Sequence, residues 1–336
     1  MRRILYLGYY VKELDVKKLL RFTRHASIET GRTWLGLWVD MISSSMRYNV
    51  SLLEYFQFRM YNLEPAERNN YAGTGFMYEY QRKMNPPNTR EALADKVRFH
   101  QVYNRFVGHQ FLTLDEARRN RTRAEEILRN PSGKVVLKRA DGQCGRGIEV
   151  VSSKDLSVDD LIKALVASGN DMVEEFVVQH DELMSLSPAG LNTVRVITQL
   201  DKQGQVIIIG ARLRITVNSS VDNLAAGNIA APVDLHTGVV SGPAVYSDIT
   251  RPDHEFHPIT GAQIVGFRLP YWQEVIDMVK SAAASNTDNR SIGWDVAITN
   301  KGPQLIEGNH DWCKLVWQLP VKQGLKPVLE EYLKEK

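Results

Sequence analysis

Residues 291–309 read SIGWDVAITNKGPQLIEGN, and this stretch predicts a β-hairpin. Two runs rich in apolar and β-branched residues flank Asn300-Lys301-Gly302, a sequence that favours a tight turn. Because side chains alternate along a strand, Glu307 and Asn309 share one face, and Asp295 lies on the partner strand. Two carboxylates and an amide oxygen on one face are suited to Mg²⁺ or Mn²⁺. The alternative interpretation is a hairpin whose acids are solvated on its outer face.

Short β-rich runs precede this hairpin in the second half of the chain. Helical segments separate some of them, at 157–168 and 271–284, and Ser157 with Asp160 gives the first a capping start. Strands and helices do not alternate regularly, so the pattern predicts an α+β fold with antiparallel hairpins. The predicted strands are KVVLK at 134–138, GIEVV at 147–151, MVEEFVV at 172–178, TVRVITQL at 193–200 and VIIIGARLRITV at 206–217.

A glycine-rich loop follows the first of these strands. Lys138 ends the strand, and the loop carries Gly145 and Gly147 before the chain returns as another strand. Glycines let backbone N–H groups approach phosphate oxygens, and a lysine adds positive charge. Walker A and Rossmann motifs are excluded, because no GK[ST] occurs and a strand follows the loop. An ordinary tight turn is the alternative interpretation.

The run Glu174-Glu175-Phe176-Val177-Val178 predicts a strand with apolar neighbours. If the backbone of this strand is left unpaired, it could hydrogen-bond an adenine edge while the apolar side chains cover the ring. Any edge strand would fit this description, so the run by itself does not select a nucleotide.

Arginines interrupt the later strands. Arg212 and Arg214 alternate with an apolar residue and therefore share a face, and Arg195 lies in the run at 193–200. Arginines that face inward from a sheet need anionic partners, because an unpaired buried charge is costly. The alternative is a solvated sheet face.

The composition is that of a globular protein. The chain has 336 residues, 43% of them hydrophobic and 24% charged, which excludes collagen-like and disordered classes and suggests two or three lobes. No apolar stretch reaches the roughly 20 residues that a membrane-spanning helix needs, and the N-terminus has no signal-peptide pattern. The two cysteines cannot form a disulfide framework or a zinc cluster on their own. We therefore expect a soluble, cytoplasmic protein.

Charge is distributed unevenly along the chain. Residues 1–140 carry 25 Lys and Arg against 14 Asp and Glu, and residues 141–336 carry 17 against 25. The basic half suggests an anionic partner, such as a phosphate, an acidic sugar or a membrane surface. The alternative is that its helices are simply solvated and arginine-rich. A nucleic-acid binder is not expected, because no RNP motif, zinc finger or dense basic block occurs.

The first 92 residues predict helices joined by short loops. Residues 51–61 (SLLEYFQFRMY) place aromatic side chains at helical spacing, as is typical of a core. Asn85-Pro86-Pro87-Asn88 breaks the pattern, and further helices are predicted at about 90–106 and 114–130. We expect a helical region at 1–92, followed by α+β subdomains at 93–190 and 191–336.

Together these elements occur in the order seen in ATP-grasp enzymes, and the resemblance covers residues 93–310. Within that superfamily the chain most resembles the sugar-transfer-associated ATP-grasp family, which is typical of polysaccharide biosynthesis. The stretches that carry this likeness are SLLEYFQFRMYNL, LNTVRVIT, VDNLAAGNIAAPVDLHTG and the terminal hairpin. The resemblance implies an ATP-grasp fold, in which two α+β subdomains hold the nucleotide between them, here preceded by a mainly helical region.

The resemblance also implies roles for individual residues. ATP would be contacted by Lys96, Lys138, Gly145 and Gly147, by the adenine hinge Glu175, Phe176 and Val177, and at the ribose by His180. Asp295, Glu307 and Asn309 would hold Mg²⁺ between the β- and γ-phosphates. Arg195, Arg212 and Arg214 would face the transferring phosphoryl group or the acceptor acid. Asn223 and Gly227 would belong to a substrate-side loop.

Three departures from the family pattern concern the loops. Cys144 occupies a position that is usually small and flexible, the paired glycines after Asn223 appear as Gly227-Asn228, and the bulky residues 310–312 follow Asn309. These differences affect the acceptor pocket more than the nucleotide and metal sites.

The implied reaction is ATP- and Mg²⁺-dependent amide formation through an acylphosphate. The substrates would be a carboxylate, such as an acidic sugar of a surface polysaccharide, and an amine, and the basic half could contact a membrane-linked glycan. Two alternatives remain: a phosphotransferase of the same fold that acts on a sugar hydroxyl, and a non-catalytic nucleotide-binding module of a glycan-assembly complex.

Overall fold

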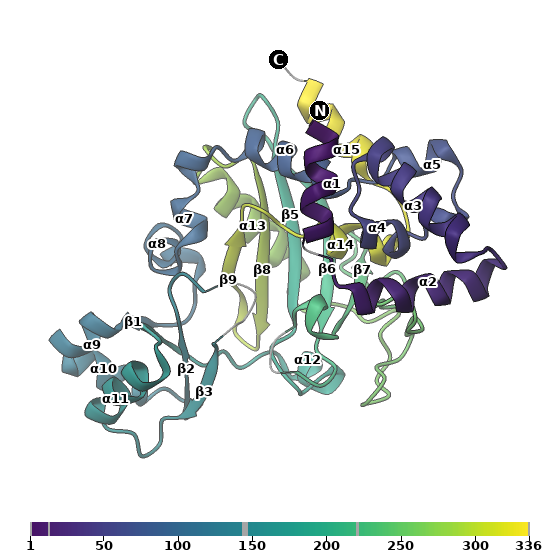
Figure 1. Ribbon diagram of the computed structural model, residues 1–336. Helices are drawn as coiled ribbons and strands as arrows, with labels where there is room; N and C mark the ends of the chain where they lie inside the picture. Colours follow the sequence, from purple (N-terminus) through teal and green to yellow (C-terminus); the bar gives the residue numbers. More distant parts are fainter. Residues whose placement is uncertain (1, 13, 143–146, 220–221, 335–336) are drawn as a thin grey trace.

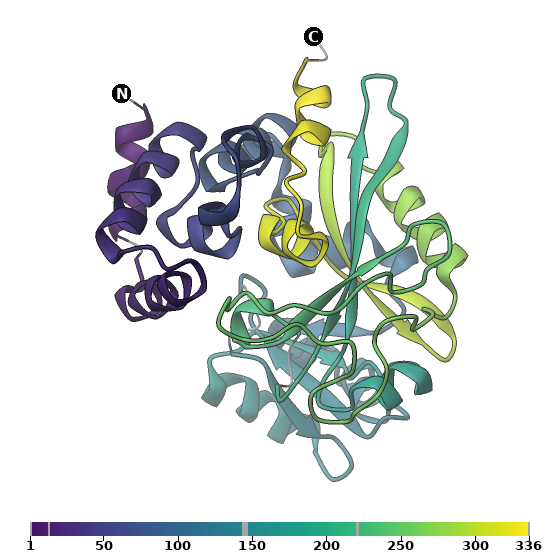
Figure 2. The same cartoon turned by 90° about the vertical axis from the view of Figure 1, so that its right-hand side faces the viewer.

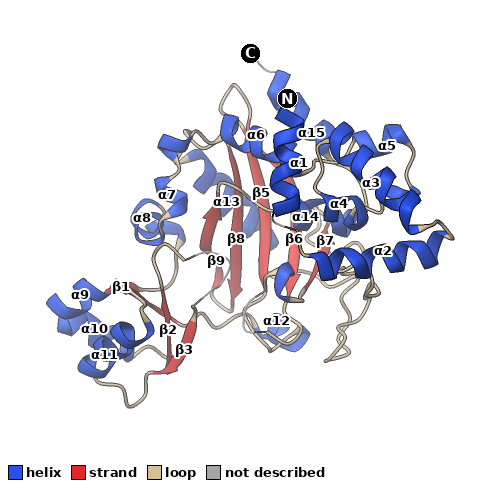
Figure 3. Ribbon diagram, viewed as in Figure 1, coloured by secondary structure: helices blue, strands red, loops and turns tan. Residues whose placement is uncertain are grey.

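The computed structural model describes residues 2–12, 14–142, 147–219 and 222–334. In this part of the chain the strands form two antiparallel sheets, a smaller and a larger one, and helices pack against both (Figures 1 and 3). The predicted α+β class with antiparallel hairpins is therefore confirmed. No helix of the described residues is long and apolar enough to cross a membrane.

The smaller sheet has the strand order β1-β4-β2-β3. Its strands are β1 (Phe111–Thr113), β2 (Lys134–Lys138), β3 (Glu149–Ser152) and β4 (Met172–Glu175). The helices α9 (Leu114–Arg119), α10 (Arg121–Leu128) and α11 (Val158–Ser168) share a core with it. The single helix predicted at 114–130 is two helices, because Asn120 ends α9 and its side chain accepts from Arg123 N at 3.1 Å to cap α10.

The larger sheet has the order β7-β6-β5-β8-β9. Its strands are β5 (Thr193–Leu200), β6 (Val206–Ile215), β7 (Ile229–Val233), β8 (Ser291–Thr299) and β9 (Gly302–Asn309). In the register of the sheet, Arg195 of β5 lies opposite Asp295 of β8, and Asp295 lies opposite Glu307 of β9. The register therefore brings a cation and two carboxyls to one level of three neighbouring strands.

Helices cover both faces of the larger sheet. Val194, Val196 and Leu213 share a core with α13 (Trp272–Ala284). On the opposite face, Ile197 packs with Trp312 and with residues of α6 (Thr74–Met84), α14 (Lys314–Gln318) and α15 (Lys326–Lys334). Gly293 of β8 must lack a side chain, because a Cβ there would lie 2.5 Å from the Cβ of Trp312. The remaining short helix of this region is α12 (Asp181–Leu186).

The N-terminal region is helical. The helices α1 (Arg2–Lys12), α2 (Val16–Thr30), α3 (Trp34–Tyr48) and α4 (Leu52–Gln57) share one core, and α5 (Pro65–Asn69), which has no buried residue, follows them. Tyr55, Phe56, Phe58 and Tyr61 are buried there, so the predicted aromatic core is confirmed. The predicted helix at 51–61 stops early, because Arg59 takes a left-handed conformation (φ 48°) before a 3₁₀ turn, Met60–Asn62.

A buried ion pair joins this helical region to the larger sheet's C-terminal helices. Glu54 on α4 pairs with Lys314 at 2.7 Å and accepts from Ser51 N and Thr74 N, so its carboxylate is fully satisfied. Further along, the predicted helix at 90–106 consists of α7 (Glu91–Ala94), α8 (Lys96–Val102) and a 3₁₀ turn, Asn104–Phe106. The boundaries near 92 and 190 stay predictions; β1–β4 lie within 93–190, and β5–β9 lie within 191–336.

Candidate nucleotide and metal site

Asp295 is the centre of a buried charge cluster on the larger sheet. Arg195 donates from Nε and Nη2 to its two oxygens, and Arg214 donates from Nη1 to Oδ2 at 2.7 Å. Arg214 also pairs with Asp222 at 2.6 Å. Burial alone would raise the pKa of Asp295, but the charges of Arg195 and Arg214 outweigh it and hold this pKa well below its usual range.

Glu307 lies beside Asp295 in a different electrostatic position. Loss of solvent and the neighbouring negative charge of Asp295 raise the pKa of Glu307 to about 7. Asn309 donates from Nδ2 to Glu307 Oε1 at 3.2 Å and to the carbonyl of Gly293 at 3.3 Å. Three carboxyls, those of Asp222, Asp295 and Glu307, therefore share the positive charges of two arginines, Arg195 and Arg214.

These oxygens fit a divalent cation. Glu307 and Asn309 line a pocket, whereas both oxygens of Asp295 are held by Arg195 and Arg214, which line the same pocket. Carboxylate and amide oxygens are the ligands that Mg²⁺ prefers, and a cation would remove the cause of the raised pKa of Glu307. Glu307 and Asn309 are thus the accessible ligands, and Asp295 would need to release an arginine contact to join them.

The pocket beside Glu307 has a volume of about 310 Å³ and brings together residues that the sequence predicted separately. Its wall includes side chains from the helical region, Lys18 of α2 and Gln57 of α4, and Trp312 after the hairpin. The predicted site residues that line it are Lys96, Arg195, Arg214, Asn223, Glu307 and Asn309.

A second buried cluster surrounds Glu174 on the smaller sheet. Lys138 forms an ion pair with its carboxylate, and His100 Nε2 lies 2.9 Å from Oε1. His109 lies further away, at 3.5 Å. Burial would raise the pKa of Glu174, but the charge of Lys138 and the bond from His100 hold it well below the usual range.

The ligand atoms of Glu174, His100 and His109 lie within 4.8 Å of one another. Such a set can hold a transition metal, but the ammonium of Lys138 already neutralises this carboxylate. We therefore interpret the cluster as a hydrogen-bonded support for Lys138.

Lys96 lies between the two clusters. Burial, followed by the positive charge of Lys138, lowers the pKa of Lys96, while Glu307 and Glu174 oppose this shift. Its ammonium donates to the carbonyl oxygens of Ala140 and Gly142. One helix, α8, carries Lys96 and His100 four residues apart and so serves both clusters.

The predicted adenine hinge differs from the sequence interpretation. β4 is an interior strand between β1 and β2, so its backbone is paired and is not a free edge. At its last residue, Glu175 N donates to Gln110 O at 3.0 Å, and just after the strand Phe176 N donates to Lys134 O at 3.4 Å. Val177 follows in the loop, and no backbone carbonyl of the described residues accepts a hydrogen bond from its N–H. An adenine contact by these residues stays a prediction, with Val177 the available donor.

His180 also has a structural role. Its backbone N–H donates to Ile298 O at 2.7 Å, and its Nδ1 accepts from Glu182 N at 3.2 Å to cap α12. A ribose contact could use only its other ring nitrogen.

Arg212 does not join the other two arginines. Its guanidinium donates from Nε to the carbonyl of Trp317 at 3.0 Å and from Nη1 to that of Ala211 at 2.7 Å. Burial without a carboxylate partner lowers its pKa to about 10. Arg212 therefore binds the end of α14 and does not face the place predicted for the phosphoryl group. The sequence showed only that Arg212 and Arg214 share a strand face, and it could not show that α14 covers this face at Arg212.

The predicted loop residues have different surroundings. Asn223 caps a 3₁₀ turn, Leu224–Ala226, by accepting from Ala225 N at 3.0 Å, and Gly227 ends that turn with φ 88°. Gly147 is exposed, with φ 72°, in the turn before β3. Gly145 and Cys144 lie outside the described residues.

Sequence reasoning missed several residues of the site. Asp222, which immediately precedes the predicted Asn223, also accepts from Thr193 N at 2.9 Å. Glu174 is the neighbour of the predicted Glu175. The pairing of β4 with β2 sets Glu174 beside Lys138, and the sequence does not show which strands pair. The other missed residues are His100, His109, Lys18 and Gln57.

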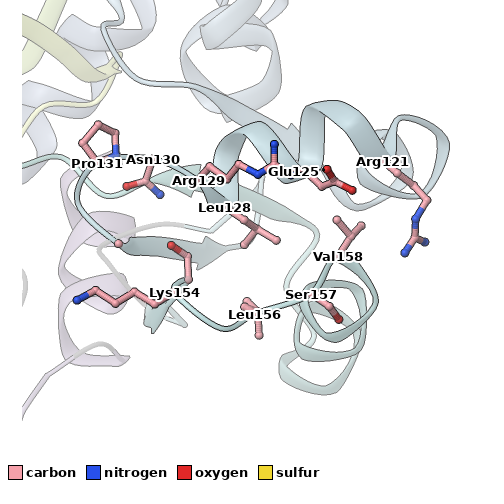
Figure 4. Close-up of a pocket in the computed structure, with 12 residues that line it drawn as sticks. Arg121, Glu125, Leu128, Arg129, Asn130, Pro131, Lys154, Leu156, Ser157 and Val158 are labelled. Atoms are coloured by element: carbon pink, nitrogen blue, oxygen red, sulfur yellow. Dashed lines mark hydrogen bonds and ion pairs between the residues drawn. The ribbon is translucent and has the colours of Figure 1, made fainter.

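A wider groove of about 650 Å³ lies on the smaller-sheet region, between α10 and the start of α11. Figure 4 shows Arg121 and Lys154 at opposite ends of this groove. Arg121 forms an ion pair with Asp159, and Arg129 forms one with Glu125. Both arginines of the groove are therefore neutralised by neighbouring acids. None of the predicted site residues lines it.

Two antiparallel α+β units, with lysines on one and arginines and carboxyls on the other, define an ATP-grasp protein. Residues 76–334 match the profile of the family described as sugar-transfer associated ATP-grasp. The chain belongs to the sugar-transfer associated ATP-grasp family. This confirms the predicted fold and family, and the expected cofactors, ATP and Mg²⁺, agree with the assignment.

Several solved structures are similar at low identity. The ATP-grasp ligase PsnB with precursor peptide PsnA2 and AMPPNP shares 15% identity (TM-score 0.44, 75% of this chain and 62% of that chain). Biotin carboxylase from Campylobacter jejuni shares 16% (0.44, 84% and 59%). An L-amino acid ligase from Bacillus licheniformis shares 14% (0.43, 81% and 52%). This chain thus spans less than two thirds of each of these proteins, and the likenesses establish no activity for it. No curated protein matches the sequence.

Proposed function

We propose that the protein is an ATP- and Mg²⁺-dependent carboxylate–amine ligase that acts through an acylphosphate. The observation that carries this proposal is the single pocket in which Lys96, Arg195 and Arg214 meet Glu307 and Asn309. Phosphates and a carboxylate are anions, and the pocket offers them a concentration of cationic side chains next to oxygen ligands for a metal.

With Mg²⁺ bound at Glu307 and Asn309, the charge of the pocket would favour an anionic acceptor. Lys18, Lys96, Arg195 and Arg214 line it, against the acids Glu307 and Asp311. Arg195 and Arg214 are fixed by buried carboxylates, so they need no reorganisation to bind an anion. A carboxylate attacks without first losing a proton, and hence the site needs no general base for the first step.

The chemistry balances in two steps. A carboxylate oxygen of the acid forms a bond to the γ-phosphorus as the bond from that phosphorus to the bridging oxygen breaks, and ADP leaves. The amine nitrogen then bonds to the acyl carbon, the carbon–oxygen bond to phosphate breaks, and the nitrogen loses a proton. Bound Mg²⁺ would neutralise phosphate charge. The residues of the chain position the reactants and stabilise their charge. Lys96 and Lys138 would bind the nucleotide, and Arg195 and Arg214 would bind the transferring phosphoryl group.

We further propose that the acid is an acidic sugar or a related acid of surface polysaccharide biosynthesis, and that the reaction takes place in the cytoplasm, where ATP is available. The family description supports this substrate class. The acceptor would lie against Asn223 and against Lys18 and Gln57, which the helical region contributes to the pocket.

The test is phosphate release from ATP with glucuronate or galacturonate as the acid and hydroxylamine or an amino acid as the amine. Hydroxylamine traps an acylphosphate as a hydroxamate, and we expect hydroxamate and phosphate in equal amounts. Arg214→Lys should lower this rate, and Val166→Ser, on an exposed face of α11, should leave it unchanged. Phosphate retained on a sugar hydroxyl would favour the phosphotransferase instead, and nucleotide binding without turnover of any acid would favour the non-catalytic module.

A further inference from the structure

The outer face of α3 is apolar although it is exposed. Leu35, Val39, Ile42 and Met46 are 73%, 61%, 44% and 42% exposed, and their spacing places them in one row along the helix. The inner face carries Leu37 and Met41 in the core of the helical region. A helix at the surface of a globular protein normally turns polar residues outward, so this row marks an interaction surface.

A second row on α2 leads to the same corner of the molecule. Val16, Leu20 and Ile28 are 56%, 39% and 76% exposed, and Arg24 occupies the position between Leu20 and Ile28. Because α2 ends at Thr30 and α3 begins at Trp34, the two rows meet at this turn. Trp34 is itself 41% exposed. We call these two rows, with Trp34, the apolar face; α1 and α2 form the left edge of the molecule in Figure 2.

Exposed cations accompany the apolar row on α2. Lys17, Arg21 and Arg24 are exposed on α2, but Arg21 pairs with Asp248 at 2.6 Å, so Lys17 and Arg24 are the cations of this row that have no ion pair among the described residues. The two acids of α2 and α3 are neutralised within the protein, because Glu29 pairs with Arg59 at 2.6 Å and Asp40 with Arg68 at 2.6 Å. The apolar rows are therefore accompanied by positive charge.

We propose that the apolar face docks onto the anionic surface of a lipid bilayer. Helices with apolar residues on the face turned to the membrane and with lysine and arginine beside them lie in the interface between headgroups and acyl chains. Exposed cations are attracted to anionic headgroups, and tryptophan favours the same depth. A second copy of the chain fits less well, because a two-fold interface would set the same cations against one another.

Docking in this way also positions the candidate site. Lys18, on the same helix as Leu20 and Arg24, lines the 310 Å³ pocket. The pocket would therefore lie close to the bilayer. The docking proposal does not depend on the ligase activity, since it concerns a surface that is separate from the nucleotide and metal residues.

The experiment is co-sedimentation of the full chain with phosphatidylcholine vesicles, with and without phosphatidylglycerol. We expect binding only to the anionic vesicles and a loss of roughly tenfold or more in the partition coefficient for the triple variant Leu35→Ser, Val39→Ser and Ile42→Ser. Lys17→Glu with Arg24→Glu should also abolish binding and leave the apolar rows intact. The control is Ile259→Ser, which removes a side chain 62% exposed elsewhere and should change nothing.

The results distinguish a lipid bilayer from a second copy of the chain as the partner of the apolar face. Far-ultraviolet circular dichroism and thermal unfolding test whether each variant is folded. We expect every variant to be folded, because the replaced side chains are exposed. Failure of the wild-type chain to bind anionic vesicles overturns the proposal, and so does undiminished binding by the triple variant. A dimer in light scattering that the triple variant disperses would show that a second copy covers this face and would also overturn it.

Discussion

The two sheets each bury a carboxylate among cations, but they compensate it differently. On the smaller sheet, Glu174 is the one carboxyl of its cluster, and Lys138 and His100 satisfy it. On the larger sheet, Arg195 and Arg214 compensate Asp295, Arg214 also pairs with Asp222, and Glu307 remains beside them with its pKa raised to about 7. The first cluster is electrostatically complete, whereas the second lacks a positive charge.

This difference separates structural support from ligand binding. A satisfied cluster holds its members in place, and Lys138 is therefore positioned by Glu174 before any nucleotide arrives. A carboxyl that lines a pocket and has no cationic partner of its own is a site for a cation. The metal site is accordingly expected at Glu307 and Asn309, and Asp295 with its arginines forms the wall behind it.

Replacing the central carboxylate of the larger sheet has the largest expected effect. In Asp295→Asn the buried Arg195 loses its anionic partner, and Arg214 keeps only Asp222. We expect the free energy of unfolding to fall by about 3–5 kcal/mol, because breaking a buried ion pair leaves an uncompensated charge. Urea unfolding measures this loss. Asp311→Asn, at an exposed acid, is the control, and equal stability of the two variants would contradict the assigned role of Asp295.

The raised pKa of Glu307 predicts a pH dependence. Between its ordinary pKa of 4.5 and about 7 the folded protein keeps a proton that the unfolded chain has lost. The stability that this group contributes is complete below pH 4.5 and is lost as the pH rises to 7, by about 3 kcal/mol. The low pKa of Asp295 acts in the opposite sense and only at lower pH, where stability is lost as the pH falls below 3.8.

Thermal unfolding at pH 5 to 8 (roughly the window in which Glu307 titrates) tests this pH dependence in the wild type and in Glu307→Gln. The glutamine variant should lack the decline, and Mg²⁺ with ADP should reduce it in the wild type. A decline of the same size in Glu307→Gln would assign it to another group.

The satisfied cluster should tolerate loss of its charge better. Glu174→Gln keeps a hydrogen-bonding partner for His100 and leaves one flexible ammonium, Lys138, without a carboxylate. We expect a loss of about 2 kcal/mol, smaller than that of Asp295→Asn, measured by the same unfolding experiment. A larger loss in Glu174→Gln would reverse the comparison between the two clusters.

The smallest expected effect distinguishes the two histidines. His100→Gln removes a contact of 2.9 Å to Glu174 and should cost about 1 kcal/mol. His109→Gln should cost less, because His109 lies 3.5 Å from the carboxylate and its buried ring nitrogens have no hydrogen-bond partner among the described residues. Matched urea unfolding of the two variants checks the order, and a greater loss for His109 would show that its role has been underestimated.

The sequence predicted the hairpin and most of the strands, because alternation and turn residues are local signals, but it did not predict β1 or β7. It also named Asp295, Glu307 and Asn309 as one set, but the turn alone does not fix their register, because an irregularity between Asp295 and Val296 shifts the pairing so that Asp295 lies opposite Glu307. It could not predict that Arg212 binds the carbonyl of Trp317, because this contact joins residues 105 positions apart. The free hinge backbone was likewise mispredicted, because strand order, which places β4 inside its sheet, is not a local property. The roles of Lys138 and Lys96 toward a nucleotide stay predictions.

The most direct measurement is isothermal titration of the chain with AMPPNP, with and without Mg²⁺, for the wild type, Glu307→Gln and the control Ile259→Ser. We predict binding by the wild type that Mg²⁺ strengthens, loss of the Mg²⁺ effect in Glu307→Gln, and no change in the control. Absence of wild-type binding, or an equal Mg²⁺ effect in Glu307→Gln, would contradict the assignment of the unsatisfied carboxyl to the metal–nucleotide site.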